Sequence, residues 1–253
     1  MYPILFQIGE ISIYSYGVMI ALGILVAALA LYREAPREGI NPDHVLEAII
    51  VAAIAGLVGA RLLYVALNFS LYKGRLLEAF FTRFEGLSFY GAFIGGVLGV
   101  LLWARWRRVE FFKMADLFAP YLALGYAFGR VGCFLNGCCY GKVSDVPWAL
   151  PAPWAADNLL HHPVQLYAAL GGVIIFVILK LLRPVRPFSG FLLLALAALY
   201  GCLRFTTEFF REEPVAWLGL TAAQLFSIAL TLVAVALIVF VLIAGINKRV
   251  SAR

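Results

Sequence analysis

The residues from Gly129 to Lys142 contain the densest collection of chemically active side chains in the 253-residue chain. They read Gly-Arg-Val-Gly-Cys-Phe-Leu-Asn-Gly-Cys-Cys-Tyr-Gly-Lys and follow a long apolar run. A charged arginine at the centre of a membrane helix costs roughly 2.5–3.5 kcal/mol, and such residues generally have a function. Because spanning a bilayer does not require this mixture of residues, we interpret the stretch as the functional site.

Two further arginines, Arg61 and Arg204, fall inside apolar runs as Arg130 does. The guanidinium group is a planar donor that suits phosphate and stays charged at any depth. Each of the three lies roughly fifteen residues from the expected cytoplasmic end of its run, about 22 Å along a helix. We therefore predict that the three arginines lie at one depth, in the outer half of the bilayer, and bind an anionic headgroup.

A structural role is the alternative for Arg204, because Glu208 follows at i+4 and Arg211 at i+7 on the same helical face. Arg130 has no acidic residue within one helical turn. The functional interpretation is therefore stronger for Arg130 than for Arg204.

Three of the four cysteines, Cys133, Cys138 and Cys139, belong to the same stretch. They could form a disulfide near the outer face, or two thiolates and a histidine could bind a metal, although no usual zinc spacing is present. They could also be small apolar packing residues, which is our interpretation of Cys202. We favour packing or an incidental disulfide over a catalytic thiol.

Other polar residues fall at the expected outer ends of apolar runs. His161 and His162 precede one run, and a histidine beside the interface is either merely solvated or functional. Tyr14, Tyr16 and Tyr90 are typical of an aromatic belt at the membrane interface. Only their expected position at the same depth as the three arginines suggests a functional role. We interpret Asp116 as a structural residue, because an acid is favourable at a helix N-terminus. We also expect the glycines at 91, 95, 99, 125 and 129 to allow close helix packing.

Composition identifies the class of protein. The chain is 64% hydrophobic and 13% charged, with a mean hydropathy of +0.94. Soluble domains have about 25% charged residues, so we predict an all-α polytopic membrane protein forming one domain over residues 1–253. Seven runs are long enough to cross a bilayer. They are about Tyr14–Leu31, Val45–Leu67, Ser88–Trp103, Ala115–Phe134, Val164–Leu182, Ser189–Phe209 and Leu220–Ile246.

The loops between these runs predict the orientation. One set of connections carries twelve Lys and Arg residues, whereas the other, which includes Lys73, Arg75 and Arg83, carries five. Positive loops remain in the cytoplasm, which places the N-terminus outside and the C-terminus in the cytoplasm. The net charge of +6 suits an anionic membrane surface.

The sequence resembles the prolipoprotein diacylglyceryl transferases of bacterial inner membranes over nearly its whole length. The stretch from Gly129 to Lys142 is similar to the family signature Gly-Arg-x-Gly-Asn-Phe-x-Asn-Gly-Glu-x-x-Gly-Arg. The other matching motifs are Tyr16-Gly17-Val18-Met19, Gly59-Ala60-Arg61, Ser88-Phe89-Tyr90-Gly91, His162-Pro163-Val164-Gln165-Leu166-Tyr167, and the segment from Tyr200 through Arg204 and Glu208 to Arg211.

The resemblance implies transfer of the diacylglyceryl group of phosphatidylglycerol to the lipobox cysteine of a prolipoprotein, with a thioether and glycerol phosphate as products. By the match, Arg130 and Arg204 would hold the lipid phosphate, supported by Tyr16 and Asn136. Glu208 and Arg211 would orient Arg204 and the mouth of the site. The further substrate-binding candidates are Arg61, Gly141, Lys142, Gln165 and Tyr200.

The resemblance implies the lipid bilayer, phosphatidylglycerol and the lipobox-bearing signal peptide as partners, with no nucleic acid, no metal and no organic cofactor. It also implies residence in the bacterial inner membrane, with the active site towards the periplasmic side.

The chain departs from the family pattern at five polar positions: Tyr90 replaces histidine, Cys133 asparagine, Cys138 glutamate, Lys142 arginine and Ala168 an acid. Tyrosine, with a pKa near 10, is a poor base at neutral pH, so Tyr90 and His162 are both candidates for activating the acceptor thiol. The alternatives to the transferase are a relative with the same lipid donor and another acceptor, a lipid or anion transporter, and a thiol–disulfide oxidase that cycles the cysteines.

Overall fold

The computed structural model describes residues 2–9, 11–72, 86–153, 155 and 157–251. Lys73, Arg75 and Arg83, which entered the loop charge count, lie outside these residues. The contacts within the chain define two compact units: unit 1 comprises Met1–Leu29 and Ala115–Arg253, and unit 2 comprises Ala30–Met114. The single domain expected from the sequence stays a prediction.

Seven helices in the described part of the chain are long and apolar enough to cross a membrane, which confirms the predicted all-α polytopic architecture. Their most apolar windows have mean hydropathies between 1.2 and 3.1. The helices are α1 (Ser15–Glu34), α2 (Pro42–Leu67), α4 (Phe89–Arg107), α5 (Phe111–Asn136), α6 (Val164–Leu182), α7 (Phe191–Glu208) and α8 (Ala222–Ser251). Short 3-10 turns, η1 (Ala35–Glu38), η2 (Phe69–Tyr72) and η3 (Arg183–Val185), follow α1, α2 and α6.

Glycines set the spacing of α2 and α4 in unit 2. A Cβ atom added to Gly59 would lie 2.4 Å from the Gly91 carbonyl oxygen, and one added to Gly95 would lie 2.4 Å from that of Ala55. The two helix backbones therefore approach to a distance that a larger side chain would prevent. This confirms the packing role predicted for the glycines at 91 and 95, and Gly99 packs against Ala55 in the same way. The prediction was wrong for Gly125, whose Cβ would meet nothing within 4 Å.

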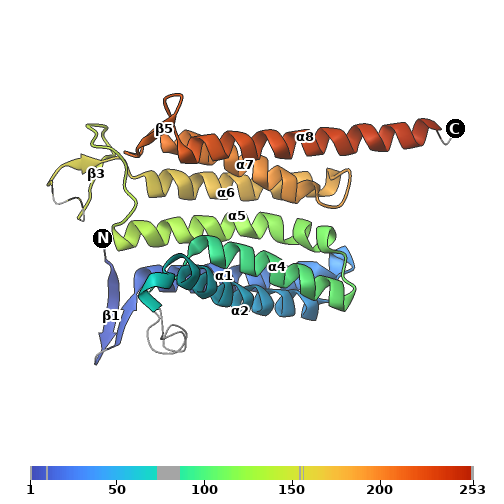
Figure 1. Cartoon of the computed structure of the whole chain (residues 1–253), viewed down its shortest axis with the longest axis horizontal. Helices are drawn as coiled ribbons and strands as arrows, with labels where there is room; N and C mark the ends of the chain where they lie inside the picture. Colours follow the sequence, from blue (N-terminus) through green and yellow to red (C-terminus); the bar gives the residue numbers. More distant parts are fainter. Residues whose placement is uncertain (1, 10, 73–85, 154, 156, 252–253) are drawn as a thin grey trace. The chain divides into compact units, whose positions relative to one another are not determined.

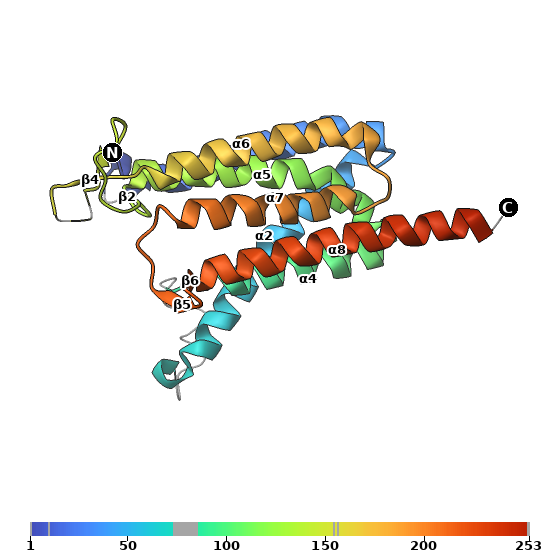
Figure 2. The same cartoon turned by 90° about the horizontal axis from the view of Figure 1, so that it is seen from above.

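Unit 1 is built around α5, α6, α7 and α8. Helix α6 packs against α7, and α7 packs against α8, and the three run side by side in both views (Figures 1 and 2). The buried cluster that joins α5 to α6 and α7 consists of small and aliphatic side chains: Ala119, Ala123, Ile175, Leu179, Leu192 and Ala195. Small residues at such contacts let membrane helices approach closely and gain dispersion energy.

Three short antiparallel hairpins accompany the helices in the described part of unit 1. They are β1 (Ile4–Ile8) with β2 (Ile11–Tyr14), β3 (Leu150–Pro151) with β4 (Leu160–His161), and β5 (Val215–Trp217) with β6 (Leu220–Thr221). Two residues separate the end of the second hairpin from α6, and the third hairpin ends immediately before α8. The sequence analysis did not predict these strands.

Asp116 caps α7 from a distant point in the sequence. Its side chain is 1% exposed, and it accepts hydrogen bonds from the backbone N–H groups of Gly190 (2.8 Å), Leu192 (2.9 Å) and Leu193 (3.1 Å). The first turn of a helix has N–H groups without intrahelical partners, and its partial positive charge favours a carboxylate. The structural role expected for Asp116 is therefore confirmed, but the helix end that it satisfies is that of α7 rather than that of α5.

Replacing Asp116 tests this cap. Asp116→Ala should lower the unfolding free energy by about 3 kcal/mol, because three buried N–H groups lose a charged acceptor. Asp116→Asn should lose roughly half as much, since its amide oxygen can still accept from Leu192 and Leu193. Thermal unfolding of the purified protein in detergent measures both, and wild-type stability in Asp116→Ala would contradict the cap.

Candidate functional site

The polar stretch begins where α5 ends. Gly137 has a φ of 79°, a left-handed conformation that glycine adopts without steric cost, and its N–H donates to the Phe134 carbonyl at 3.1 Å. The Cys138 N–H then donates to the Cys133 carbonyl at 3.2 Å. These bonds end the helix and turn the chain into the segment from Gly137 to Lys142, which we call the site loop.

Two segments hold the site loop. One is His162, just before α6, and the other is the stretch that follows α7. The Gly141 N–H donates to the His162 carbonyl (2.9 Å), and the Lys142 N–H donates to the Phe210 carbonyl (2.8 Å). The buried Gln165 side chain donates to the Cys138 carbonyl at 2.7 Å. Irregular backbone that is buried in a protein is stable only where other groups satisfy its hydrogen bonds in this way.

Only glycine fits at position 141. A Cβ atom there would lie 2.4 Å from the Phe210 carbonyl oxygen, 2.5 Å from Val164 Cγ2 and 2.9 Å from His162 Cβ. The substrate-binding role expected for Gly141 stays a prediction, but the close approach of three segments gives it a structural reason to be glycine. Lys142, the next residue, is exposed.

Arg130 lies on α5, one turn after Tyr126, and its guanidinium carbon is 4.9 Å from the centre of the Tyr126 ring. Among the described residues, no carboxylate lies within 4.0 Å of the Arg130 guanidinium group. Tyr126 is also within electrostatic range of Arg204 on α7, and its ring contacts that of Tyr200 edge to face at 5.4 Å. Unit 1 thus gathers Arg130, Arg204 and Tyr200 around Tyr126.

The buried Tyr126 hydroxyl group lies beside the Arg130 guanidinium, which can only donate to it, and none of the described residues accepts its proton. Buried polar groups are nearly always satisfied, so a donor left unpaired beside two arginines indicates a place for an acceptor from outside the chain. A phosphate oxygen is an acceptor of this kind.

Glu208 organises the C-terminal end of α7. Its carboxylate is 3% exposed, lies 2.6 Å from the Arg204 guanidinium and 3.6 Å from that of Arg211, and accepts a 2.9 Å hydrogen bond from the Thr221 hydroxyl. Arg211 also pairs with Glu213 at 2.6 Å. The ion pair foreseen from the i+4 spacing of Arg204 and Glu208 is confirmed. The pair restricts the position of the Arg204 guanidinium group.

Cys133, Cys138 and Cys139 form a cluster in which all Sγ atoms lie within 4.8 Å of one another. All are free thiols, so the disulfide that the sequence allowed is absent from these described residues. Hydrogen bonding from Cys133 and Cys138, together with the Arg130 and Arg211 guanidinium groups, lowers the pKa of the Cys139 thiol. Cys202 is exposed on α7 instead of packed, so our interpretation of that residue was wrong.

Tyr16 reaches the same region from the start of α1. Its ring packs against Gly132 of α5, where an added Cβ would lie 3.1 Å from Tyr16 Cδ2, and its hydroxyl is within electrostatic range of Arg130 and the three thiols. Asn136, the other residue expected to support Arg130, is the last residue of α5.

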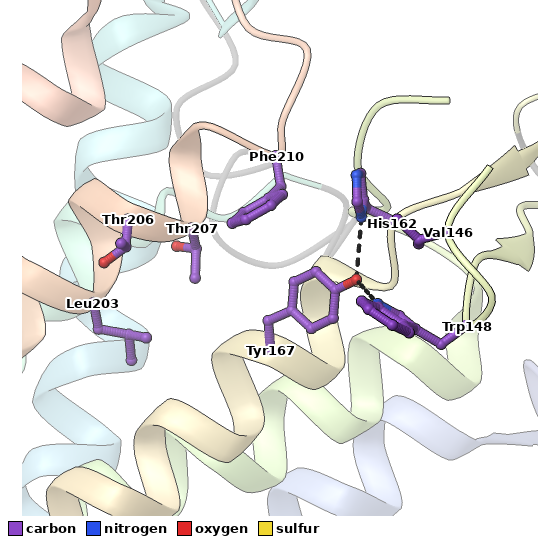
Figure 3. Close-up of a pocket in the computed structure, with 8 residues that line it drawn as sticks. All are labelled: Val146, Trp148, His162, Tyr167, Leu203, Thr206, Thr207 and Phe210. Carbon is purple, nitrogen blue, oxygen red and sulfur yellow. Dashed lines mark hydrogen bonds between the residues drawn. The ribbon is translucent and has the colours of Figure 1, made fainter. Parts of the chain in front are cut away.

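An apolar hollow of about 470 Å³ lies beside the site loop (Figure 3). Trp148, His162, Tyr167 and Phe210 form its aromatic wall, and residues of the last turns of α7 line the other side (Figure 3). The Trp148 Nε1–H donates to the Tyr167 hydroxyl oxygen at 2.6 Å, and this oxygen is 3.1 Å from His162 Nδ1. The His162 ring also contacts that of Phe210 at 5.1 Å.

The two histidines before α6 therefore differ in their surroundings. His161 is 5% exposed, its Nδ1–H donates to the Gly141 carbonyl at 2.8 Å, and its Nε2 lies 3.0 Å from an Asp157 carboxylate oxygen. The Leu159 N–H and His161 together lower the pKa of Asp157. His161 braces the site loop, whereas His162 faces the hollow.

Two predicted site residues belong to unit 2. Arg61 is 8% exposed, donates to the Gly86 carbonyl at 3.0 Å, and lies over the rings of Tyr64 (5.7 Å) and Tyr72 (5.9 Å). Tyr90 is 73% exposed in the first turn of α4. Their participation in the site, and the common depth expected for the three arginines, stay predictions.

Sequence reasoning missed several residues of unit 1. Tyr126 could have been found, because it precedes Arg130 by four residues on the same face of the predicted helix. Trp148 and Thr221 gave no such signal, because their partners Tyr167 and Glu208 lie in other segments of the chain.

The chain is similar to known proteins over most of its length. The family model described as prolipoprotein diacylglyceryl transferase matches residues 3–240. A Clostridium tetani protein named phosphatidylglycerol–prolipoprotein diacylglyceryl transferase is 35% identical over 219 residues, covering 85% of this chain and 87% of the relative. Proteins with the same name from Geobacter sulfurreducens (38% over 225 residues; 87% and 85%) and Wolbachia sp. subsp. Drosophila simulans (37% over 240 residues; 91% and 91%) are also similar.

Replacing Gly141 tests how the site loop is held. In Gly141→Ala the methyl group must displace Phe210 or His162, so we expect amide hydrogen exchange in the site loop to rise at least about tenfold, equivalent to about 1.4 kcal/mol of local stability. Gly125→Ala on α5 is the matched control, because its Cβ would meet nothing within 4 Å. Exchange followed by mass spectrometry measures both, and unchanged site-loop exchange in Gly141→Ala would contradict the packing argument.

Proposed function

The chain belongs to the prolipoprotein diacylglyceryl transferase family, and on this premise we propose how unit 1 performs the reaction. The protein transfers the diacylglyceryl group of phosphatidylglycerol to a prolipoprotein. In the proposal, the acceptor atom is the sulfur of the lipobox cysteine. A sulfur–carbon bond forms at the glyceryl carbon, the carbon–oxygen bond to the phosphate breaks, and the phosphate leaves with the headgroup glycerol.

The lipid phosphate binds between Arg130 and Arg204 in this proposal. The observation that carries it is the buried Tyr126 hydroxyl, whose proton has no acceptor among the described residues and which lies within electrostatic range of both guanidinium groups. One hydroxyl donor and two planar cations suit the two non-bridging oxygens and the departing ester oxygen of a phosphate that gains charge as it leaves. Donors fixed before the reaction stabilise that charge without further reorganisation.

The neighbouring residues keep these donors in place. Tyr126 holds the Arg130 guanidinium over its ring, and Glu208 holds that of Arg204. In the proposal, Tyr16 and Asn136 support Arg130, and Tyr200 supports Tyr126. Lys142, which is exposed, and Arg211 add positive charge at the mouth of the site, where an anionic headgroup arrives.

His162 is the proposed base for the acceptor thiol. It lines the hollow, and the Tyr167 oxygen, which accepts from Trp148, can also accept from His162 Nδ1–H. This arrangement leaves a lone pair on His162 Nε2 for the thiol proton. The apolar walls of the hollow suit the side chains of a signal peptide, and Gln165 and Gly141 keep the site loop beside it.

We further propose that the protein resides in the bacterial inner membrane, with its N-terminus outside, its C-terminus in the cytoplasm and its site towards the periplasm. The multi-pass architecture and the bacterial relatives support residence in the inner membrane. The distribution of Lys and Arg among the loops supports the orientation.

The role of Arg130 is tested in nanodiscs that contain phosphatidylglycerol, with a lipobox peptide as acceptor. Arg130→Ala should lower kcat by about 10²–10³-fold, as expected for loss of one donor to a developing anion. Arg130→Lys should restore only part of the rate, because an ammonium group cannot bind phosphate through a planar fork. Mass spectrometry follows the diacylglyceryl peptide and the released glycerol phosphate.

The same assay separates the alternatives. Release of glycerol phosphate without peptide modification would indicate a different acceptor. Full activity in Arg130→Ala would contradict the proposed phosphate site, and absence of both products, with an active family member as positive control, would contradict the transferase function of this chain.

The identity of the base is tested by comparing His162→Gln with Tyr90→Phe. At neutral pH, His162→Gln should lower kcat by about 10²–10⁴-fold, the usual contribution of a general base. The defect should shrink as the pH rises towards about 8.5, where a cysteine thiol ionises in water without help. Tyr90→Phe should change kcat little. A large, pH-dependent loss in Tyr90→Phe alone would assign the base to Tyr90 instead.

A further inference from the structure

The three thiols of the site loop and α5 are arranged as a set of metal ligands. Cys133, Cys138 and Cys139 are half-buried, and their Sγ atoms all lie within 4.8 Å of one another. The Cys138 and Cys139 Sγ atoms are 3.6 Å apart. In a zinc–thiolate site with bonds of about 2.3 Å, neighbouring sulfur atoms are about 3.8–4.0 Å apart, so only small side-chain movements would close the cluster around an ion.

Local backbone structure creates this arrangement. Cys133 lies in the last turn of α5, and the turn at Gly137 folds the chain back so that the Cys138 N–H reaches the Cys133 carbonyl. Cys139 has a φ of 65°, a left-handed conformation that is unusual for a residue with a Cβ atom. This conformation brings the side chains of two adjacent cysteines close together instead of directing them apart. The Gln165 hydrogen bond to the Cys138 carbonyl keeps the turn in place.

We propose that Cys133, Cys138 and Cys139 bind one soft divalent cation, such as Zn²⁺ or Cd²⁺, through three thiolates. Thiolates select soft and borderline metal ions over Mg²⁺ and Ca²⁺, which take oxygen ligands. Three sulfur ligands leave a fourth position for water or another small ligand. This site does not depend on the transfer reaction, and its failure would leave the proposed function standing.

The charges around the cluster favour a metal–thiolate group. Three thiolates and a divalent cation have a net charge of −1, which would be costly in a half-buried cluster without compensation. The Arg130 guanidinium is within electrostatic range of Cys133 and Cys139, and Arg211 is within range of Cys139. In the protein without bound lipid, Arg130, which has no carboxylate partner among the described residues, supplies the balancing charge together with Arg211.

Cadmium binding to the reduced, purified protein tests the proposal. We expect one Cd²⁺ per chain, with the ultraviolet charge-transfer absorption of a cadmium–thiolate bond, in both wild type and Cys202→Ser. Cys202 lies outside the cluster, so this variant is the matched control. Cys133→Ser, Cys138→Ser and Cys139→Ser should each weaken binding by at least the roughly 10–100-fold that loss of an outer metal contact costs.

A second measurement uses only the wild-type protein, so it does not depend on whether a variant folds. Cd²⁺ should protect Cys133, Cys138 and Cys139 of the wild-type protein from maleimide, read by mass spectrometry, and should leave the reaction of Cys202 unchanged. Equal cadmium binding by the variant lacking all three cluster thiols, or equal labelling of the cluster with and without Cd²⁺, would overturn the site.

Discussion

The buried ion pair between Glu208 and Arg204 is the interaction on which the rest of the site depends. A carboxylate that is 3% exposed is stable only when its charge is compensated, and Arg204, Arg211 and the Thr221 hydroxyl surround it. Together they connect the end of α7 to the start of α8. Removing the carboxylate would leave Arg204 without its nearest anion and Arg211 with Glu213 alone, so Glu208 fixes both the position of the Arg204 cation and the course of the chain after α7.

Phe210 extends this constraint to the other half of the site. Its carbonyl accepts from the Lys142 N–H, and its ring contacts His162 at 5.1 Å and Tyr167 at 5.5 Å. The segment that follows Glu208 therefore holds the site loop with its backbone and lines the apolar hollow with its side chain. Phosphate binding and thiol activation, as we propose them, share one support, which explains how two reacting groups from different substrates would be positioned together.

Part of this architecture follows from sequence because it is local. Hydropathy located all seven spans, and α6 begins and ends at the predicted residues, Val164 and Leu182. The i+4 spacing located the Arg204–Glu208 pair. The two-stranded hairpins could not be found in this way, since strands of two to five residues contain too little periodicity. The contacts of Asp116 with α7 and of Trp148 with Tyr167 join residues far apart in the chain, and hydropathy carries no information about them.

The support of the site loop also explains how this chain tolerates its unusual cysteines. Gln165 binds the backbone carbonyl of residue 138, not its side chain, and the Lys142 and Gly141 contacts are likewise made by backbone N–H groups. A glutamate at position 138 or an asparagine at position 133 is therefore not needed to shape the loop. The side chains there are free to change chemistry while the loop keeps its course, and replacing oxygen and amide groups by sulfur beside Arg130 converts one wall of the site into a set of soft ligands.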